Sequence, residues 1–163
     1  MSFEIVLLIA QASATFFLAA WLSTGVFENV FYSDLNRTFT SEVLDFTRMR
    51  EQYPDAYARV AHRRITNPKA LNGLFRLIVL WELVAVLALW AGVVALVLAV
   101  FGNLEPDAAR AWALLGALLF TSTWAGFLIV GNWFCYWFCH EGAQNTHYQM
   151  TLWGFATMLL LAV

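Results

Sequence analysis

The sequence predicts an all-α integral membrane protein: a four-helix bundle with short amphipathic helices in the connection between its first and second spans. Of its 163 residues, 61% are hydrophobic and 12% are charged, whereas a soluble domain is about half apolar and about a quarter charged. The apolar residues come in runs close to the roughly 20 residues that a transmembrane helix needs. A soluble core of this size could not bury such runs, so we expect a single membrane domain over residues 1–163.

Four apolar runs predict the four spans. The second run is the most apolar and carries one charged residue after Arg76, namely Glu82. The fourth run is short, so it crosses the bilayer only if its first turn begins near His147 or the bilayer thins locally. A signal-peptidase-like Ala-Ser-Ala sequence lies inside the first run, which continues past it, so we expect a retained helix. The expected spans are residues 5–31, 74–101, 111–131 and 147–163.

The first two connections between these spans differ in length and charge. Residues 102–110 form a short, acidic loop, whereas residues 32–73 carry seven of the nine basic residues. Apolar residues recur at helical spacing on both sides of Tyr53-Pro54, which predicts two short amphipathic helices at the membrane surface. Asn67-Pro68 supplies a helix-capping side chain followed by proline at the first helical position, so the second long helix is expected to start there. By the positive-inside rule, the basic 32–73 connection would lie in the cytoplasm.

Glu82 is the residue that most suggests a function. It lies about 12 Å from the start of the second run at 1.5 Å per residue, a depth where a carboxylate is costly unless it is paired, protonated or facing water. It could carry a proton or contact a quinone, a lipid or another small ligand. It could equally lock the bundle through hydrogen bonds, with Arg76 or the Thr121–Thr123 stretch of the third run as partners.

Other polar residues approach the same side of the membrane as Glu82. They could rim a polar pocket with Glu82 as its floor, because a polar cluster inside a helical bundle is a natural place for a cavity. Polar residues also collect at helix ends without any such role, so both interpretations are open. The four candidates are Glu28, Asn132, His140 and His147.

The stretch WFCYWFCHEGAQNTH, residues 133–147, is rich in side chains that bind metals. Cys135, Cys139, His140 and His147 form the pattern C-x3-C-H-x6-H. On a helix the two cysteines would share a face while His140 points about 100° away, and structural zinc sites use tighter pairs. Haem is conceivable, although the C-x-x-C-H attachment sequence is absent. We predict no cofactor, keep metal or haem as an alternative, and expect the five aromatic residues to form an interfacial belt.

The remaining patterns narrow the class of function. Small residues one helical turn apart, at Ala88/Gly92 and Ala113/Ala117, permit close helix contact within the chain or with a partner. The sequence has no nucleophile elbow, phosphate loop or nucleotide fingerprint, so we predict that the protein is not an enzyme. A net charge of −2 gives no sign of nucleic-acid binding. The expected partners are the lipid bilayer and other membrane proteins or further copies of the chain.

Several short motifs follow one another in a characteristic order: Asn29–Asn36, Tyr53-Pro54-Asp55, Arg64–Pro68, Trp81-Glu82, and Gly131–Phe134 leading to Gly142 and Gln144. In these motifs the chain resembles a family of predicted small integral membrane proteins of bacteria, of unknown function. The resemblance implies four membrane helices and no assigned activity, and we expect the bacterial inner membrane. The family tends to carry a basic linker between spans two and three, which would put the termini in the cytoplasm. Here that linker is short and acidic, so the orientation is left open.

The leading hypothesis is a non-enzymatic accessory or assembly subunit of a larger membrane protein complex, or a small self-associating unit. It is based on the lack of catalytic motifs and on an aromatic-rich surface that exceeds the needs of lipid anchoring. One alternative is a bundle that binds a small ligand, quinone, lipid or proton at Glu82. A second alternative is a metal or haem redox protein that uses Cys135, Cys139, His140 and His147.

Overall fold

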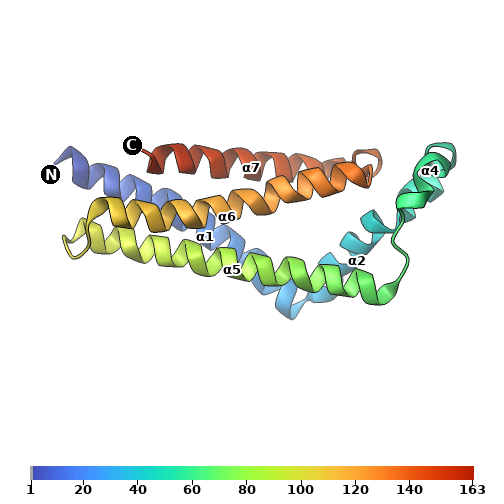
Figure 1. Ribbon diagram of the computed structural model, residues 1–163, viewed down its shortest axis with the longest axis horizontal. Coiled ribbons are helices and arrows are strands. Elements are labelled where there is room, and N and C mark those ends of the chain that lie inside the picture. The colour runs from blue at the N-terminus through green and yellow to red at the C-terminus, as the bar shows by residue number, and fades with distance from the viewer. Residues whose placement is uncertain (1) are drawn as a thin grey trace.

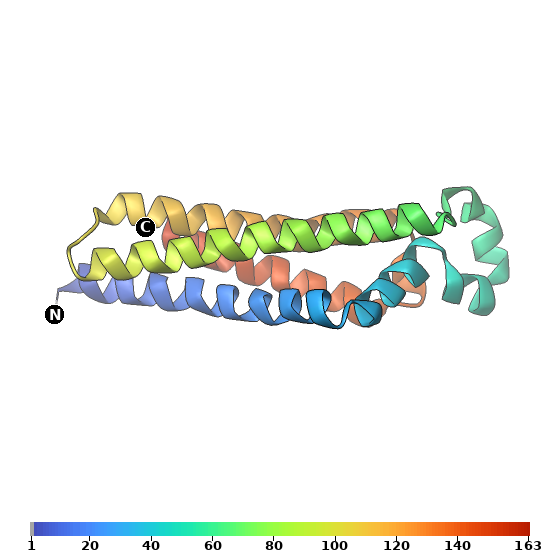
Figure 2. The same ribbon diagram turned by 90° about the horizontal axis from the view of Figure 1, so that it is seen from below.

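Four long helices run side by side along one axis in the computed structural model, which describes residues 2–163 (Figures 1 and 2). They are α1 (Phe3–Phe31), α5 (Pro68–Val100), α6 (Pro106–Trp133) and α7 (Glu141–Leu161). Helices make up 88% of the chain, and no strand occurs in the part that the structure describes. The all-α prediction is confirmed. The start of α1 and the end of α7 lie at the same end of the molecule (Figure 1).

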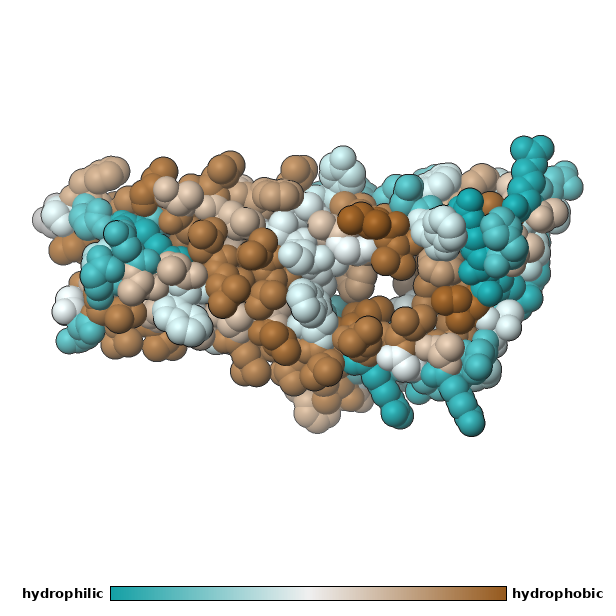
Figure 3. Space-filling view, viewed as in Figure 1, coloured by the Kyte–Doolittle hydropathy of each residue, from teal (hydrophilic) through white to brown (hydrophobic). Residues whose placement is uncertain are grey.

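Three of these helices, α1, α5 and α6, are long and apolar enough to cross a membrane. The fourth, α7, is 21 residues long, but its first turns carry polar side chains, among them Gln144, Asn145 and His147. Three of the four predicted spans are therefore supported by helices of sufficient length and hydropathy. Hydrophobic side chains cover the middle of the molecule and hydrophilic ones gather at its two ends (Figure 3), as expected when the middle lies in lipid.

Helices α5 and α6 begin before their apolar runs because capping, not hydropathy, sets their first residue. The side chain of Asn67 accepts a hydrogen bond from the Lys69 backbone N–H at 2.9 Å, and Glu105 does the same for Ala108 at 2.8 Å. Each cap is followed by proline, which suits the first helical position. Consequently α5 and α6 start ahead of the expected residues 74 and 111. Helix α7 also starts early, at Glu141 rather than at 147, although its first residue has no such side-chain cap.

Short helices fill the connecting segment, residues 32–67, which joins α1 to α5. They are α2 (Ser33–Leu44), α3 (Thr47–Gln52), α4 (Pro54–Val60) and a 3₁₀ turn at Ala61–Arg63. The chain breaks at Tyr53-Pro54, as expected, and also at Phe46, whose φ is 55°. This left-handed conformation is uncommon for a bulky residue. The placement of these helices on a membrane surface stays a prediction.

Two separate hydrophobic cores hold the molecule together. The larger lies among the long helices and contains side chains that are 0–1% exposed, such as Leu18, Leu22, Leu89, Leu96 and Phe120. The smaller core joins the connecting segment to the turn between α6 and α7, and consists of Leu44, Phe46, Met49, Phe134 and Cys135. The connecting segment is thus docked on one end of the bundle.

Helices α5 and α6 lie backbone to backbone at the end away from the connecting segment. A Cβ added to Gly92 would lie 2.5 Å from the Ala113 Cα, and one added to Gly116 would lie 2.8 Å from the Leu89 Cα. Towards the connecting segment the two helices separate, which leaves an opening in the surface (Figures 1 and 3). The small residues singled out in the sequence, Gly92 and Ala113, therefore serve a contact within the chain.

Candidate functional site

A chain of three polar side chains links α1, α2 and α5 at Glu82. Glu82 is 5% exposed, and its Oε2 accepts a hydrogen bond from Asn29 Nδ2 at 2.7 Å. Asn29 Oδ1 in turn accepts one from Asn36 Nδ2, also at 2.7 Å. Such bonds offset the cost of removing a carboxylate and an amide from water. We call these three residues the Glu82 lock; it fastens the elbow where α1 turns into α2 (Figure 2).

The partner of Glu82 differs from those expected. Thr123 accepts a hydrogen bond from Trp81 Nε1 at 3.0 Å, and Thr121 bonds to the Ala117 carbonyl of its own helix. The prediction that Glu82 bonds to Arg76 or to the Thr121–Thr123 stretch is therefore wrong. Neighbouring residues on a helix point about 100° apart, so Trp81 faces α6 while Glu82 faces α1.

The two non-histidine pocket candidates are exposed and make no hydrogen bond to Glu82 within residues 2–163. Glu28 is exposed, whereas its neighbour Asn29 is 8% exposed and meets Glu82. Asn132 is exposed on the last turn of α6. The sequence-based prediction thus named Glu28, whereas its neighbour Asn29 makes the hydrogen bond to Glu82. The buried amide could have been found from helical spacing, because Asn29 continues the line of Leu22 and Val26 on the buried face of α1.

The two histidines lie in different aromatic surroundings. His140 is 7% exposed and meets the Phe39 ring of α2 edge to face, with centroids 4.9 Å apart. The His147 ring packs 5.1–6.0 Å from the centroids of three rings, those of Trp124, Phe127 and Tyr136. In both histidines Nδ1 is buried without a hydrogen-bond partner among residues 2–163. The contacts seen for the two histidine rings are thus with aromatic side chains, and a polar pocket with Glu82 as its floor stays a prediction.

Burial lowers the pKa of His140 below its ordinary value, the charge of Arg48 lowers it further, and Glu42 opposes the shift. Unfolded histidine binds its proton at about pH 6.5, whereas folded His140 requires a lower pH. Between the two values the unfolded state binds more protons, so stability falls as the pH falls through this window.

We expect the thermal midpoint of the purified protein to drop between about pH 7.5 and about pH 5.5, a range that crosses the ordinary histidine pKa. The His140→Gln variant should show a smaller drop, because glutamine does not titrate. His62→Gln, at an exposed position of the connecting segment, is the matched control. A pH dependence that is the same in His140→Gln and wild type would contradict the assignment.

The cysteine and histidine pattern does not form one site. Helix α6 ends at Trp133, Cys135 has a φ of 53°, and a 3₁₀ turn precedes Cys139, so the cysteines do not share a helix face as assumed. Cys135, Cys139 and His140 line a cavity of about 10 Å³, about the space of one water molecule. Within the described chain, no group of three or more His, Cys, Asp or Glu residues could hold a metal ion. The metal and haem alternative gains no support from this geometry.

The aromatic residues of the 133–147 stretch divide into two sets. Trp133 and Trp137 are 56% and 38% exposed, whereas Phe134 and Tyr136 are 7% and 3% exposed. A Cβ added to Gly131 would lie 2.7 Å from the Tyr136 ring, which shows how closely the chain folds back. The prediction of an interfacial belt is wrong for Phe134 and Tyr136. The chain reverses at Cys135, so that Phe134 packs against the connecting segment, whereas the Tyr136 ring lies against Gly131 of α6 and His147 of α7.

A second polar node, at the other end of the bundle, was missed by sequence reasoning. Gln11 is fully buried; its Nε2 donates to the Leu160 carbonyl at 2.9 Å and its Oε1 accepts from Arg110 Nε at 3.2 Å. Arg110 also pairs with Glu4 and Asp107. The available signal was an isolated amide in an apolar helix, a residue type that joins membrane helices by hydrogen bonds. The node ties α1, α6 and α7 together.

Comparison with known proteins agrees with this architecture. Residues 7–163 match the model of a family described as predicted small integral membrane protein (DUF2165). The chain belongs to this family. No curated protein and no solved structure is significantly similar to it. As a member of this family, the chain is a small integral membrane protein, and the matched region contains both the Glu82 lock and the connecting segment.

In this family member the buried polar groups mostly hold helices to one another. Glu82 joins α1 to α5, Trp81 joins α5 to α6 through Thr123, and Gln11 joins α1 to α6 and α7. At the connecting segment, Arg63 lies 4.4 Å from the Trp133 ring centroid and donates to the Trp133 carbonyl. Together these contacts tie the long helices and the connecting segment to one another.

Proposed function

We propose that the protein is a non-enzymatic accessory or assembly subunit of a membrane protein complex in the bacterial inner membrane. The observation that carries the proposal is the docking of the connecting segment on the bundle. A loop that only joins two spans has no need of a hydrophobic core of its own, yet this segment buries Leu44, Phe46 and Met49 against the α6–α7 turn. A fixed surface of this kind suits the recognition of another protein.

In this proposal α7 crosses the membrane as the fourth span. Its 21 residues extend about 32 Å at 1.5 Å per residue, close to the roughly 30 Å hydrocarbon core of a bilayer. Leu152, Phe155 and Leu159 are exposed along its apolar half, where lipid would cover them. The polar first turns, with Gln144 and Asn145, would lie among the headgroups.

The outer side of the connecting segment offers charges for a partner. Arg48 and Arg64 are used internally, in ion pairs with Glu42 and Asp45. Other charged residues on α3 and α4 make no ion pair within residues 2–163: Arg50, Glu51, Asp55 and Arg59. Mixed charges on a rigid surface suit a complementary polar partner, since charge pairing sets specificity and orientation.

The proposal is tested by extraction from native membranes in a mild detergent, followed by native mass analysis. We expect the wild-type chain to co-purify in a defined stoichiometry with another membrane protein. Arg50→Glu/Arg59→Glu should release the chain as a monomer with an unchanged melting temperature. Asn103→Glu, an added acid in the loop at the other end, should leave the complex intact. A strictly monomeric wild-type chain would contradict the proposal. A double variant that still assembles would show that Arg50 and Arg59 do not contact the partner.

A further inference from the structure

A cleft of about 270 Å³ opens between α2 and the first turns of α5. Its polar lining is supplied by Arg37, Thr38, Ser41, Glu42, Asp45, Thr47 and Asn72. The cleft belongs neither to the Glu82 lock nor to the outer charges of α3 and α4.

One part of the lining is rich in unused hydrogen-bond donors. Arg37, Thr38 and Ser41 follow one another along one side of α2, and no hydrogen bond or ion pair within the described residues uses their side chains. A guanidinium carries five N–H donors in a planar fork, and each hydroxyl adds one. Such a set matches the oxygens of a phosphate group, which arginine binds in bidentate fashion.

Another part of the lining is negatively charged. Glu42 accepts a hydrogen bond from Arg48 through Oε2 at 2.8 Å, and Asp45 accepts bonds from Arg64 and from the Thr47 hydroxyl. These bonds hold both carboxylates in place but leave the Glu42 Oε1 without a partner among residues 2–163. The cleft therefore presents a cation and two carboxylates to the same space, an arrangement that fits a ligand with both signs of charge.

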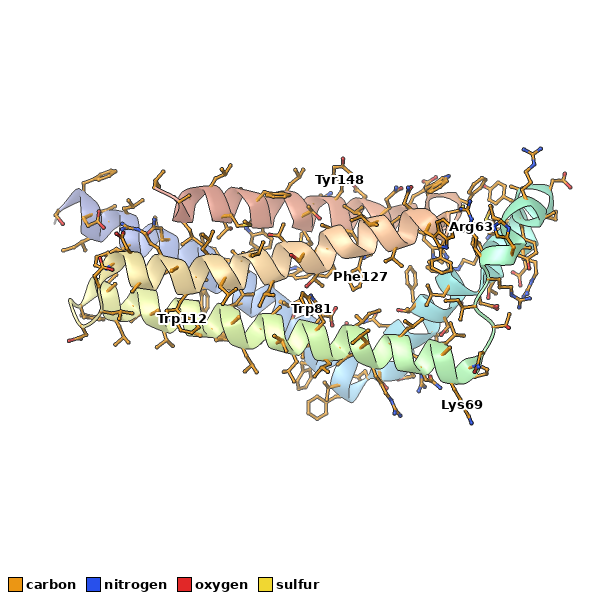
Figure 4. The ribbon with its side chains drawn as sticks, viewed as in Figure 1. Arg63, Lys69, Trp81, Trp112, Phe127 and Tyr148 are labelled. Atoms are coloured by element: carbon orange, nitrogen blue, oxygen red, sulfur yellow. The ribbon has the colours of Figure 1, made fainter. Side chains whose placement is uncertain are left out.

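The position of the cleft along α5 places it at the headgroup level of a bilayer. Helix α5 has 33 residues, about 50 Å at 1.5 Å per residue, and so exceeds the roughly 30 Å hydrocarbon core. Its first turns carry Lys69, which projects outward (Figure 4), and Arg76; from Leu77 onward the exposed face of the helix is apolar. Asn72 lies between the two basic residues, so the cleft opens just outside the apolar part.

We propose that this cleft binds the headgroup of a phosphoethanolamine glycerolipid. The phosphate lies against Arg37, Thr38 and Ser41, and the primary ammonium lies against Glu42 and Asp45. The acyl chains follow the exposed apolar side chains of the neighbouring helices into the membrane. A choline headgroup lacks the N–H donors that the carboxylates would receive, and a phosphoglycerol headgroup lacks the positive charge.

The test uses the purified full chain in mixed micelles with equal amounts of phosphatidylethanolamine, phosphatidylcholine and phosphatidylglycerol of identical acyl chains. Native mass spectrometry should show one phosphatidylethanolamine retained in preference to the other two. Arg37→Gln should lower the retained fraction about tenfold, as expected for loss of hydrogen bonds to a charged group. Arg59→Gln, an exposed arginine outside the cleft, should retain the lipid as wild type does.

Three results would overturn the proposal: equal retention of the three lipids, preference for phosphatidylglycerol, or an Arg37→Gln variant that binds as wild type does. Free glycerophosphoethanolamine is added as a competitor; displacement of the lipid at equimolar amounts would assign the site to a soluble ligand instead. If Arg37→Gln does not fold by circular dichroism, Thr38→Val/Ser41→Ala must show the loss. Retention of the lipid by that folded double variant would equally overturn the proposal.

Discussion

Replacing Gly116 by alanine should strongly destabilise the bundle, whereas the same change at Gly126 on the same helix should not. A Cβ at Gly116 would lie 2.8 and 2.9 Å from the Leu89 Cα and N and 3.0 Å from the Ala88 carbonyl carbon. These are backbone atoms of α5, which cannot rotate aside as a side chain can, so α5 and α6 would have to separate. Overpacking of a well-packed contact costs about 1–3 kcal/mol, and more where nothing can yield.

The controls are supplied by the chain itself. Gly126 on α6 and Gly73 on α5 have nothing within 4 Å of an added Cβ, and alanine is favoured over glycine inside a helix by about 1 kcal/mol. Gly126→Ala and Gly73→Ala should therefore match or exceed the wild-type thermal midpoint in detergent, while Gly116→Ala should fall well below it. Equal midpoints for Gly116→Ala and Gly126→Ala would show that the two helices do not lie this close.

Asn29→Leu should be the most damaging change at the Glu82 lock. It removes the donor to Glu82 and the acceptor for Asn36 in one step. A buried group left without its partner costs about 1–3 kcal/mol, and more when it is charged. Glu82→Gln should be mild by comparison, because its amide oxygen can still accept the Asn29 N–H.

A double-variant cycle separates this locking role from a general effect of added leucine. In the Asn29→Leu background, Glu82→Leu should recover stability because it removes the carboxylate that has lost its partner. The coupling free energy between the two substitutions should be about 1–3 kcal/mol. Asn145→Leu, an exposed asparagine on α7, is the matched control and should be nearly neutral. Additive losses in the double variant would mean that Asn29 and Glu82 do not act as a pair.

How well the sequence predicted the molecule depended on the kind of interaction. Hydropathy located α1, α5 and α6, because removing apolar side chains from water is a local property of each run. Helix α7 was harder, since its first turns are polar and its packing against α6 is a long-range feature. The start of α5 at Asn67-Pro68 was readable because capping needs only neighbouring residues.

The partners in the polar contacts were harder to predict from the sequence. Glu82 was correctly singled out as a costly buried carboxylate, yet its partner depends on which way α5 is rotated against α1. That rotation is set by the whole larger core, which no local pattern contains. The same limit explains why Tyr136 was assigned to the lipid interface: its burial depends on the chain reversal at Cys135, which brings its ring against Gly131 and His147.

The Gln11 node carries a consequence for how the chain is made. Residues emerge from the ribosome in order, so α1 is made before α6 and α7, yet the partners of its Gln11 amide are Arg110 on α6 and Leu160 on α7. The Asn29 amide of α1 likewise has its partner, Glu82, on the later helix α5. A lone α1 in lipid would therefore keep two unsatisfied amides, each costly in hydrocarbon. These polar contacts of α1 can therefore form only after the later helices α5, α6 and α7 have been synthesised.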